Sequence, residues 1–294
     1  MDRRNLLKLA GAGAVVSALG CQSTEMNAEV KENPFKKSFV SWCYNKVWPL
    51  EKQIAEAVSL GCTGLEFIPP NKWDMLKKAG LECNMVGSHG YVKGLNNKMH
   101  WAECHKKLTD SIDNASAAGF PNVISFTGFY DTTQQKGSVV DDETGMKNCI
   151  EGYKKIIGYA EKKNVKIQIE VLNSRVDISM KGHPGYSGDR VEYIADIIKA
   201  VGSPNLKILF DIYHVQVMQG DLITRINANK DIIGHIHTAG CPGRGELDDK
   251  QEINYRAVFQ ALKDTGYREY VSHEFIPTRE ARQGLIEAFN LCRV

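Results

Sequence analysis

Four side chains that can bind a metal ion stand at the ends of four successive apolar runs in the second half of the chain. They are Glu170, Asp211, His237 and Glu274, and the runs that precede them begin at residues 165, 206, 232 and 270. Taken singly, each is explained as a solvated residue or as half of an ion pair. Their shared position favours one site, because burying a carboxylate without a partner is costly. Three carboxylates and one imidazole suit a single divalent cation, Mn²⁺, Mg²⁺, Co²⁺ or Zn²⁺, and the sequence leaves the choice open.

The elements that must position these side chains alternate between strand and helix. Eight short apolar or β-branched runs are predicted as strands, at Phe39–Cys43, Gly64–Ile68, Cys83–Gly87, Asn122–Phe126, Lys166–Glu170, Lys207–Asp211, Ile232–His237 and Tyr270–Phe275. Helical patterns lie between them, the clearest at Leu50–Leu60, Trp101–Ala118, Thr144–Lys163, Gly188–Val201, Ile253–Thr265 and Arg279–Leu291. Eight such units predict an α/β fold, a single-domain (β/α)₈ TIM barrel. The alternative is an open doubly wound sheet, which would be expected to have a glycine-rich loop after the first strand. Residues 43–48 contain no glycine, which favours the barrel.

In a barrel of this kind the active site lies at the carboxyl ends of the strands, which is where the four ligand-type residues would converge. Glu66 and His89 follow the second and third strands, and we expect them to face the same pocket and to bind substrate hydroxyls. His235 shares a strand face with His237 but lies one layer deeper, which favours a supporting or core role. His273 is expected to face the helices.

Two further side chains lie near the expected pocket. His183, in the loop after the fifth strand, is most simply interpreted as a solvent-exposed loop residue. Trp42, near the rim, is interpreted as a core residue in preference to a platform for a sugar ring.

Five motifs in the second half of the chain resemble the hydroxypyruvate isomerase family and, more broadly, the xylose-isomerase-like barrels that include ketose 3-epimerases. They are Glu170-Val-Leu-Asn173, Asp211-Ile-Tyr-His214, Gly234-His-Ile-His237, Pro242-Gly-Arg-Gly-Glu246 and Glu252-Ile-Asn-Tyr255. The resemblance covers most of residues 38–277. It implies that Glu170, Asp211, His237 and Glu274 are the metal ligands, and that barrels of this kind commonly form homodimers. It also implies that Glu170 and Glu274 are the catalytic acid/base pair and that His214 and Arg244 contact the substrate.

Two departures from the hydroxypyruvate isomerase pattern bear on the substrate. His237 stands where those enzymes often have Gln and sugar epimerases have His, and the loop Ser88–Tyr91 differs from theirs. Both departures weaken hydroxypyruvate as the substrate more than they weaken isomerase or epimerase chemistry.

The predicted site suits proton transfer next to a carbonyl. A divalent metal acts as a Lewis acid on an α-hydroxycarbonyl compound, and a carboxylate removes the carbon-bound proton. The proton returns at the neighbouring carbon in an isomerase, or on the opposite face in an epimerase. We therefore expect a small carbonyl or sugar substrate flanked by Glu170 and Glu274, with Arg244 holding a carboxylate or hydroxyl group.

The N-terminal segment has the features of an export signal that precedes the barrel. Arg3-Arg4-Asn5-Leu6-Leu7 and the apolar stretch to Leu19 are typical of a twin-arginine export signal, and the stretch is too short to span a membrane. Cys21 follows small residues, as at a lipoprotein cleavage site, although the order of Ala18 and Leu19 is unusual. We therefore expect a signal over 1–21, a polar tether over 22–37 and the barrel over 38–294, in a periplasmic or lipid-anchored protein.

Composition excludes several classes of protein. The 294 residues are 43% hydrophobic and 24% charged, as in an ordinary soluble globular protein. Residues 1–20 hold three of the 37 basic residues and one of the 35 acidic residues, so the remainder is neutral. A neutral chain offers no electrostatic reason to bind nucleic acid. The eight cysteines are scattered, which favours buried small side chains over a disulfide framework.

Three rival functions stay open at this point. A lyase or dehydratase acting on keto-sugars or keto-glycosides would share the first proton abstraction. A non-catalytic sugar-binding lipoprotein would not need two opposed glutamates. A metal-dependent endonuclease would use more histidines and would want a basic groove, which the neutral charge argues against.

Overall fold

The computed structural model describes residues 33–132 and 139–294. The predicted signal, residues 1–21, and most of the predicted tether lie outside the described residues, so export, the lipid anchor and the homodimer stay predictions. Among the described helices, none combines the length and apolar character that a membrane span requires.

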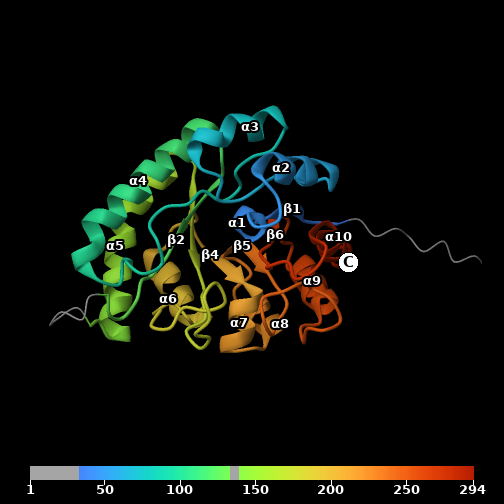
Figure 1. The fold of residues 1–294 in the computed structure, drawn as a ribbon. Coiled ribbons are helices and arrows are strands. Elements are labelled where there is room, and N and C mark those ends of the chain that lie inside the picture. Colours follow the sequence, from blue (N-terminus) through green and yellow to red (C-terminus); the bar gives the residue numbers. More distant parts are fainter. Residues whose placement is uncertain (1–32, 133–138) are drawn as a thin grey trace, which may run out of the picture. The chain divides into compact units, whose positions relative to one another are not determined.

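Six parallel strands form one sheet within the described residues. They are β1 (Lys36–Phe39), β2 (Asn122–Ser125), β3 (Lys166–Glu170), β4 (Leu206–Asp211), β5 (Ile233–Thr238) and β6 (Tyr270–His273), in the order β1-β6-β5-β4-β3-β2 (Figure 1). Two further segments close the gap between β1 and β2 through isolated parallel bridges, Val40 with Glu66, Gly64 with Glu82 and Val86 with Val123. The result is a TIM-barrel-like α/β fold of one domain, with eight positions around the ring.

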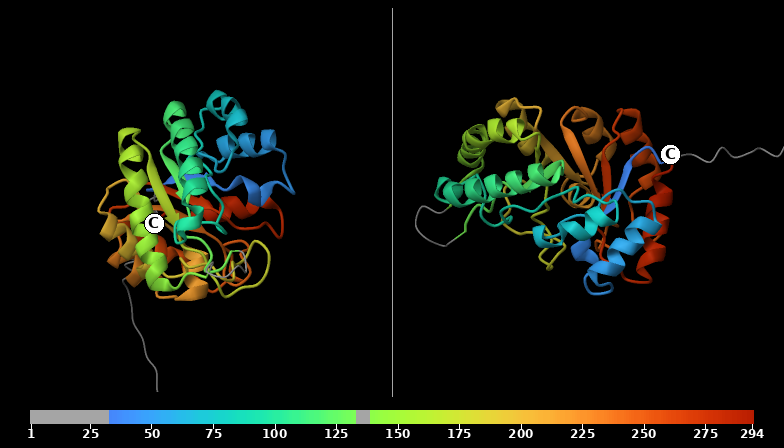
Figure 2. Two further views of the ribbon diagram at one scale, coloured as in Figure 1. Left: turned by 90° about the vertical axis from the view of Figure 1, so that its left-hand side faces the viewer. Right: turned by 90° about the horizontal axis from the view of Figure 1, so that it is seen from above.

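The helices and 3-10 turns connect successive positions of the ring. They are α1 (Ser41–Tyr44), α2 (Leu50–Ser59), η1 (Pro70–Lys72), α3 (Trp73–Lys78), η2 (Lys98–His100), α4 (Trp101–Ala118), α5 (Asp142–Lys162), α6 (Val191–Val201), α7 (Ile212–Met218), α8 (Leu222–Ala228), α9 (Tyr255–Asp264) and α10 (Ala281–Leu291). Figure 2 shows these helices on the outside of the strands, with α4, α5 and α6 as neighbours. Gly119 and Gly202 end α4 and α6 in the left-handed conformation, as the sequence pattern predicts.

The first three strand predictions were partly wrong. The first strand ends at Phe39, and Ser41–Tyr44 forms a helical turn, because a short apolar run does not by itself distinguish strand from helix. The second and third predicted strands pair only through the bridges named above. Between them, the Asn84 side chain donates to Glu66 and accepts from Ser38, so side-chain hydrogen bonds supplement the short ladder. A Cβ at Gly64 would stand 2.3 Å from the Asn84 amide oxygen, so this approach requires glycine.

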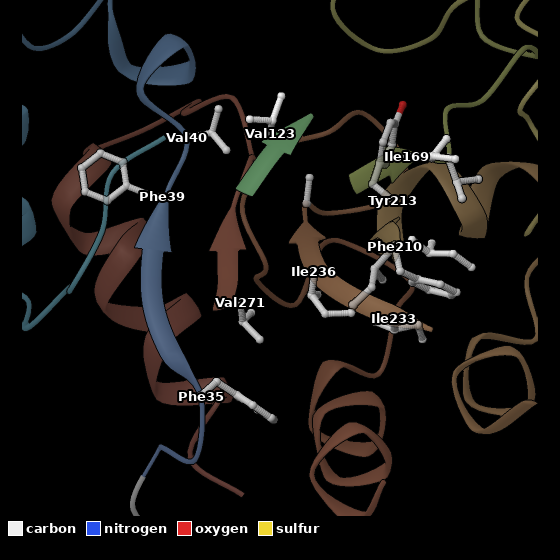
Figure 3. Close-up of a cluster of buried hydrophobic side chains, with 14 of the residues drawn as sticks. Phe35, Phe39, Val40, Val123, Ile169, Phe210, Tyr213, Ile233, Ile236 and Val271 are labelled. Atoms are coloured by element: carbon white, nitrogen blue, oxygen red, sulfur yellow. The ribbon is translucent and has the colours of Figure 1, made fainter. Parts of the chain in front are cut away.

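The main core lies between the strands and the surrounding helices. Figure 3 shows part of it, with Phe39 on β1, Val271 on β6, Ile236 on β5 and Phe210 on β4. A second, smaller apolar cluster is separate from it and contains Met85, Ile124, Phe126, Leu172, Tyr186 and Leu209. All seven described cysteines are free and buried, which confirms the prediction for those seven.

Candidate metal centre and active site

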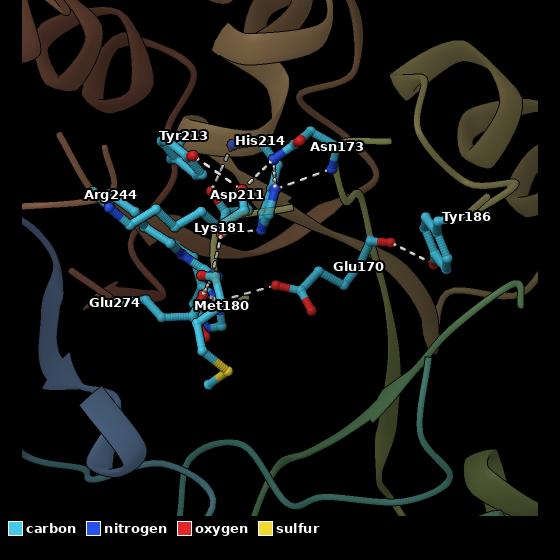
Figure 4. Close-up of polar contacts among 12 residues, drawn as sticks. Glu170, Asn173, Met180, Lys181, Tyr186, Asp211, Tyr213, His214, Arg244 and Glu274 are labelled. Carbon is cyan, nitrogen blue, oxygen red and sulfur yellow. Dashed lines mark hydrogen bonds and ion pairs between the residues drawn. The ribbon is translucent and has the colours of Figure 1, made fainter. Parts of the chain in front are cut away.

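The four predicted metal ligands come together at one end of the sheet. Glu170 and Asp211 are the last residues of β3 and β4, His237 lies next to the end of β5, and Glu274 directly follows β6. Parallel register places Asp211 beside His237 and His237 beside Ser272, two residues before Glu274. One ligand atom from each of the four lies within 4.8 Å of the others, and all four residues are buried. Figure 4 shows Glu170, Asp211 and Glu274 in this cluster.

The orientation of His237 fits a metal ligand. Its Nε2 atom lies 2.8 Å from Glu66 Oε2, while Nδ1 lies 2.8 Å from Glu274 Oε2 and 3.3 Å from Glu170 Oε1. A histidine that binds a metal commonly donates its other nitrogen to a carboxylate, which fixes the tautomer and the ring. Glu66 would supply that contact and leave Nδ1 to face the three acidic ligands. The donor set and the orientation of His237 therefore fit a divalent cation.

Glu66 lies beneath the cluster, which differs from its predicted place in the pocket wall. It is fully enclosed, and its Oε1 atom accepts from Asn84 Nδ2 at 2.8 Å, from His235 Nε2 at 2.7 Å and from the Ser272 hydroxyl. Burial alone would raise the pKa of Glu66, but the charges and hydrogen bonds of His235 and His237 hold it well below its ordinary value. An ionised, fully bonded carboxylate at this depth has no face left for a substrate hydroxyl. His235 has the supporting position that the sequence predicts.

Arg244 reaches into the cluster from the loop after β5. Its Nη2 atom donates to Glu274 Oε2 at 2.6 Å and lies 3.4 Å from Asp211 Oδ2, while Nη1 donates to the Met180 carbonyl at 2.6 Å. The guanidinium also lies 5.4 Å from the ring centre of Trp42. Arg244, which was predicted to contact the substrate, is only 3% exposed and is already paired with two carboxylates.

The backbone around Arg244 explains how the side chain enters the site. Arg244 adopts φ +58° between Gly243 and Gly245, and its carbonyl accepts from Ile276 N. Glu246 accepts hydrogen bonds from the backbone and the hydroxyl of Thr278. These contacts tie the loop after β5 to the loop after β6.

His214, the other predicted substrate contact, does not line the cavity. It is fully buried, and its Nδ1 atom accepts from the backbone and the side-chain amide of Asn173 at 3.0 and 2.6 Å. Its Nε2 atom lies 3.7 Å from Asp211 Oδ2, and burial holds the pKa of His214 well below its ordinary value. Its own backbone N–H donates to Asp211 Oδ1 at 3.0 Å, so His214 and Asn173 hold Asp211 in place (Figure 4).

The environments of the three predicted acidic ligands differ. Burial raises the pKa of Glu170, and it raises the pKa of Asp211 to about 7 although Arg244 opposes it. Burial has the same tendency at Glu274, but the charges of Arg244 and His237 lower the pKa of that carboxyl to about 2. Near neutral pH Glu274 is thus ionised and Asp211 titrates, while the pKa of Glu170 is shifted in the same direction as that of Asp211.

A cavity of about 370 Å³ opens beside the cluster. Glu170, Glu274 and Arg244 line it, whereas Asp211 and His237 are not part of its lining. His89 lines it as predicted, but its nitrogens already bond to the Ser125 hydroxyl and to backbone carbonyls, and burial lowers its pKa to about 4.

Several lining residues were missed or misplaced by the sequence. His183 lines the cavity and lies 4.3 Å from the ring of Tyr91, so the interpretation as an exposed loop residue was wrong. Trp42 donates to Glu274 Oε1 at 3.1 Å, a contact no sequence pattern indicates. The apolar lining residues Phe67, Ile124, Phe126, Leu172 and Met180 had no chemical signal that could have identified them.

Comparison with known proteins places this fold and site in a family. The model for "Xylose isomerase-like TIM barrel" matches residues 54–292. The chain belongs to that family. Hydroxypyruvate isomerase of Escherichia coli is 35% identical over 124 residues, which cover 42% of this chain and 45% of that protein. The match to a human relative is 33% identical and spans 62% of the length of that protein.

Two solved structures share the fold at lower identity. One is described as AP endonuclease, family 2, from Brucella melitensis, with a TM-score of 0.73 and 24% identity over 85% of this chain and 96% of that chain. The other is 3-keto-D-glucoside 4-epimerase from E. coli, with a TM-score of 0.70 and 16% identity over 88% of this chain and 99% of that chain. At these identities the likeness concerns the fold.

The first prediction concerns Asp211. Replacing it with alanine removes one of the predicted oxygen ligands, so Asp211→Ala should bind Mn²⁺ more than about 100-fold more weakly. The variant also loses the bond from His214 N at the start of α7, so a lower melting temperature is expected as well. Metal content after dialysis, measured by mass spectrometry, checks the prediction. Asp231→Ala, an exposed aspartate before β5, is the matched control, and full metal occupancy in Asp211→Ala would rule out its role as a ligand.

A second prediction concerns pH. Glu170 and Asp211 have raised pKa values, and the charges of Glu274 and Glu66 raise the pKa of His237 against the effect of burial. These shifts make the three groups release their protons at a higher pH than usual, and a metal binds only the deprotonated forms. The Kd for Mn²⁺ should increase as the pH falls below about 7, by up to about tenfold per unit for each displaced proton. Titration calorimetry at pH 6, 7 and 8 tests this, and a constant Kd would contradict it.

A third prediction concerns the carboxylate below His237. Glu66→Gln keeps the shape of the side chain but removes the charge that orients His237, so metal affinity should fall by about 10- to 100-fold. The visible spectrum of the Co²⁺-loaded protein should change with it. Glu82→Gln, on the adjacent bridging segment, serves as the control. An unchanged affinity and spectrum in Glu66→Gln would mean that His237 is oriented by other contacts.

Proposed function

We propose that this protein is a metal-dependent isomerase or epimerase that acts on a small α-hydroxycarbonyl compound, hydroxypyruvate-like or ketose-like. One observation carries the proposal. Of the four clustered residues, the two glutamates line the cavity, and Asp211 and His237 do not. A site that only bound a sugar would not need two carboxylates beside its ligand. The names of the relatives, an isomerase and an epimerase, support the same chemistry.

Glu170, Asp211, His237 and Glu274 would hold the divalent cation. When bound, the cation supplies Lewis-acid polarisation of the substrate carbonyl. The chain itself supplies the proton transfer. Glu274 lines the cavity and is kept ionised by Arg244, so it is the carboxylate that is free of a proton and able to accept one from carbon. Glu170, whose pKa is raised by burial, is the group ready to hold and return one.

The transfer balances without an oxidant or reductant. The C–H bond next to the carbonyl breaks, its proton passes to Glu274, and its electron pair moves into the C–O system. Glu170 then gives a proton either to the neighbouring carbon or to the opposite face of the same carbon. In the first case a hydroxyl proton also shifts between the adjacent oxygens, and in the second the configuration inverts.

The corresponding prediction is that Glu274→Gln loses turnover and keeps its fold. The amide retains hydrogen bonding but cannot accept the carbon-bound proton, so kcat should fall by at least about 100-fold. The measurement uses the full chain loaded with Mn²⁺ in D₂O, with hydroxypyruvate, D-fructose and a methyl 3-keto-glucoside as substrates, and NMR detects deuterium beside the carbonyl. Glu269→Gln, which changes a half-exposed glutamate that pairs with Lys36, is the control.

Each outcome of this experiment separates the rival functions. Metal-dependent exchange that Glu274→Gln abolishes supports the proposal. Near-normal exchange in Glu274→Gln would remove Glu274 from the acid/base pair. A product that has lost a hydroxyl or its aglycone would identify a lyase. The absence of exchange with every compound, in a protein with metal bound, would point to a binding protein.

A further inference from the structure

The wall of the cavity on the side away from the four predicted metal ligands is mostly apolar. Phe67, Ile124, Phe126 and Leu172 line it; the last three belong to the small apolar cluster that is separate from the main core, and Phe67 packs against that cluster. These side chains come from the ends of neighbouring ring positions, where barrels of this kind bind their substrates. The cavity, about 370 Å³, falls within the size range of pockets for drug-sized ligands and exceeds what a three-carbon acid would fill.

The polar side chains in the same wall are largely committed to the protein. The Ser88 hydroxyl donates to the Ile124 carbonyl, and both nitrogens of His89 have protein partners. Glu170, Glu274, Arg244 and Trp42 belong to the carboxylate cluster or contact it. Among the other described lining side chains, the His183 ring and the Tyr91 hydroxyl are left to form hydrogen bonds with a substrate. A compound with a hydroxyl on every carbon would bury several of them against apolar groups without a hydrogen bond, which is unfavourable.

The apolar surface continues from the cavity to the outside. Tyr91 and Met180 both line the cavity and are 39% and 45% exposed. The loops that carry them also expose Val92 and Ile178, and the segment after α1 exposes Val47. Exposed apolar groups that adjoin a pocket mark a surface that contacts a ligand or a partner. Here the adjoining pocket argues for the ligand, because the two exposed residues are part of its wall.

We propose that the substrate carries an apolar, ring-sized substituent next to its α-hydroxycarbonyl group, as an aryl keto-glycoside does. The inference rests on the proposed function and narrows its substrate class. The reacting carbons lie at Glu170 and Glu274, and the substituent lies along Phe126 and Leu172 toward Tyr91 at the mouth. Free ketoses and hydroxypyruvate are poor substrates because they leave this wall without a contact.

A matched pair of substrates tests the proposal. Methyl and phenyl 3-keto-glucosides share the reacting group and differ only in the aglycone. With the full chain, Mn²⁺ and D₂O, NMR gives kcat/KM for deuterium incorporation, with a chelator-treated sample for the background. We expect the phenyl compound to exceed the methyl compound, hydroxypyruvate and D-fructose by about tenfold or more.

Variants of the wall identify where the preference arises. Leu172→Asn places an amide in the apolar wall at similar size and should lower the phenyl-to-methyl ratio by about tenfold. Tyr91→Ser changes a partly exposed residue, which folding tolerates better, and should lower the ratio several-fold through KM. Ile223→Ser, which removes an exposed apolar side chain on α8 outside the cavity lining, should keep the wild-type ratio.

The outcomes distinguish this inference from the proposed function. Exchange with equal rates for the phenyl and methyl compounds, or faster exchange with D-fructose, overturns the apolar-substituent proposal and leaves the isomerase proposal standing. A ratio that survives both wall variants also overturns it. The absence of metal-dependent exchange with all four compounds is the failure of the proposed function itself.

Discussion

The concentration of negative charge in the barrel end is the constraint on which the rest of the structure depends. Glu66, Glu170, Asp211 and Glu274 are all buried, and one carboxylate oxygen of each lies within 4.8 Å of a nitrogen of His237. Carboxylates gathered in a low-dielectric interior are stable only if they are protonated, paired with cations or bound to a metal. In the described part of the chain, the nearby cations are Arg244 and a protonated His237. Two cations do not match four carboxyl groups, and burial raises the pKa of Glu170 and Asp211 accordingly, so a divalent cation would complete the balance.

The loops of the barrel are arranged to keep that balance in place. Arg244 stands on the loop after β5, but its contacts reach the carbonyl of Met180 after β3, the ring of Trp42 after β1 and the carboxylate of Glu274 after β6. Glu246 fastens the loop after β5 to Thr278. A single guanidinium therefore couples loops that are distant in sequence, and the cavity lies where those loops meet. This explains why a carboxylate cluster and a substrate cavity share one location.

The sequence predicted the parts of this arrangement that depend on the recurrence of apolar runs and on the residues at the strand ends. Glu170, Asp211 and His237 follow clear apolar runs, and parallel strands bring such ends together whatever the surrounding loops do. Glu66 and His214 were predicted to contact the substrate, but neither lines the cavity, because depth within the ring depends on side-chain contacts such as those of Asn84 and Asn173. Those contacts join residues far apart in sequence and have no local pattern. The wall of Phe126 and Leu172 was missed for a related reason, since an apolar residue at a strand end looks the same whether it faces the core or a ligand.

Arg244 shows why the roles of the site are hard to separate by removing residues. Its guanidinium lines the cavity, as a substrate contact would, and it also lowers the pKa of Glu274. Loss of Arg244 would leave Glu274 and Asp211 with less positive charge, raise their affinity for protons and change the metal affinity along with any contact to the substrate. A loss of activity in such a variant would have three explanations. Changes that alter one property at a time, a carboxylate to its amide or an apolar wall residue to a polar one, separate charge balance, proton transfer and substrate fit, because each leaves Arg244 and its partners in the cluster.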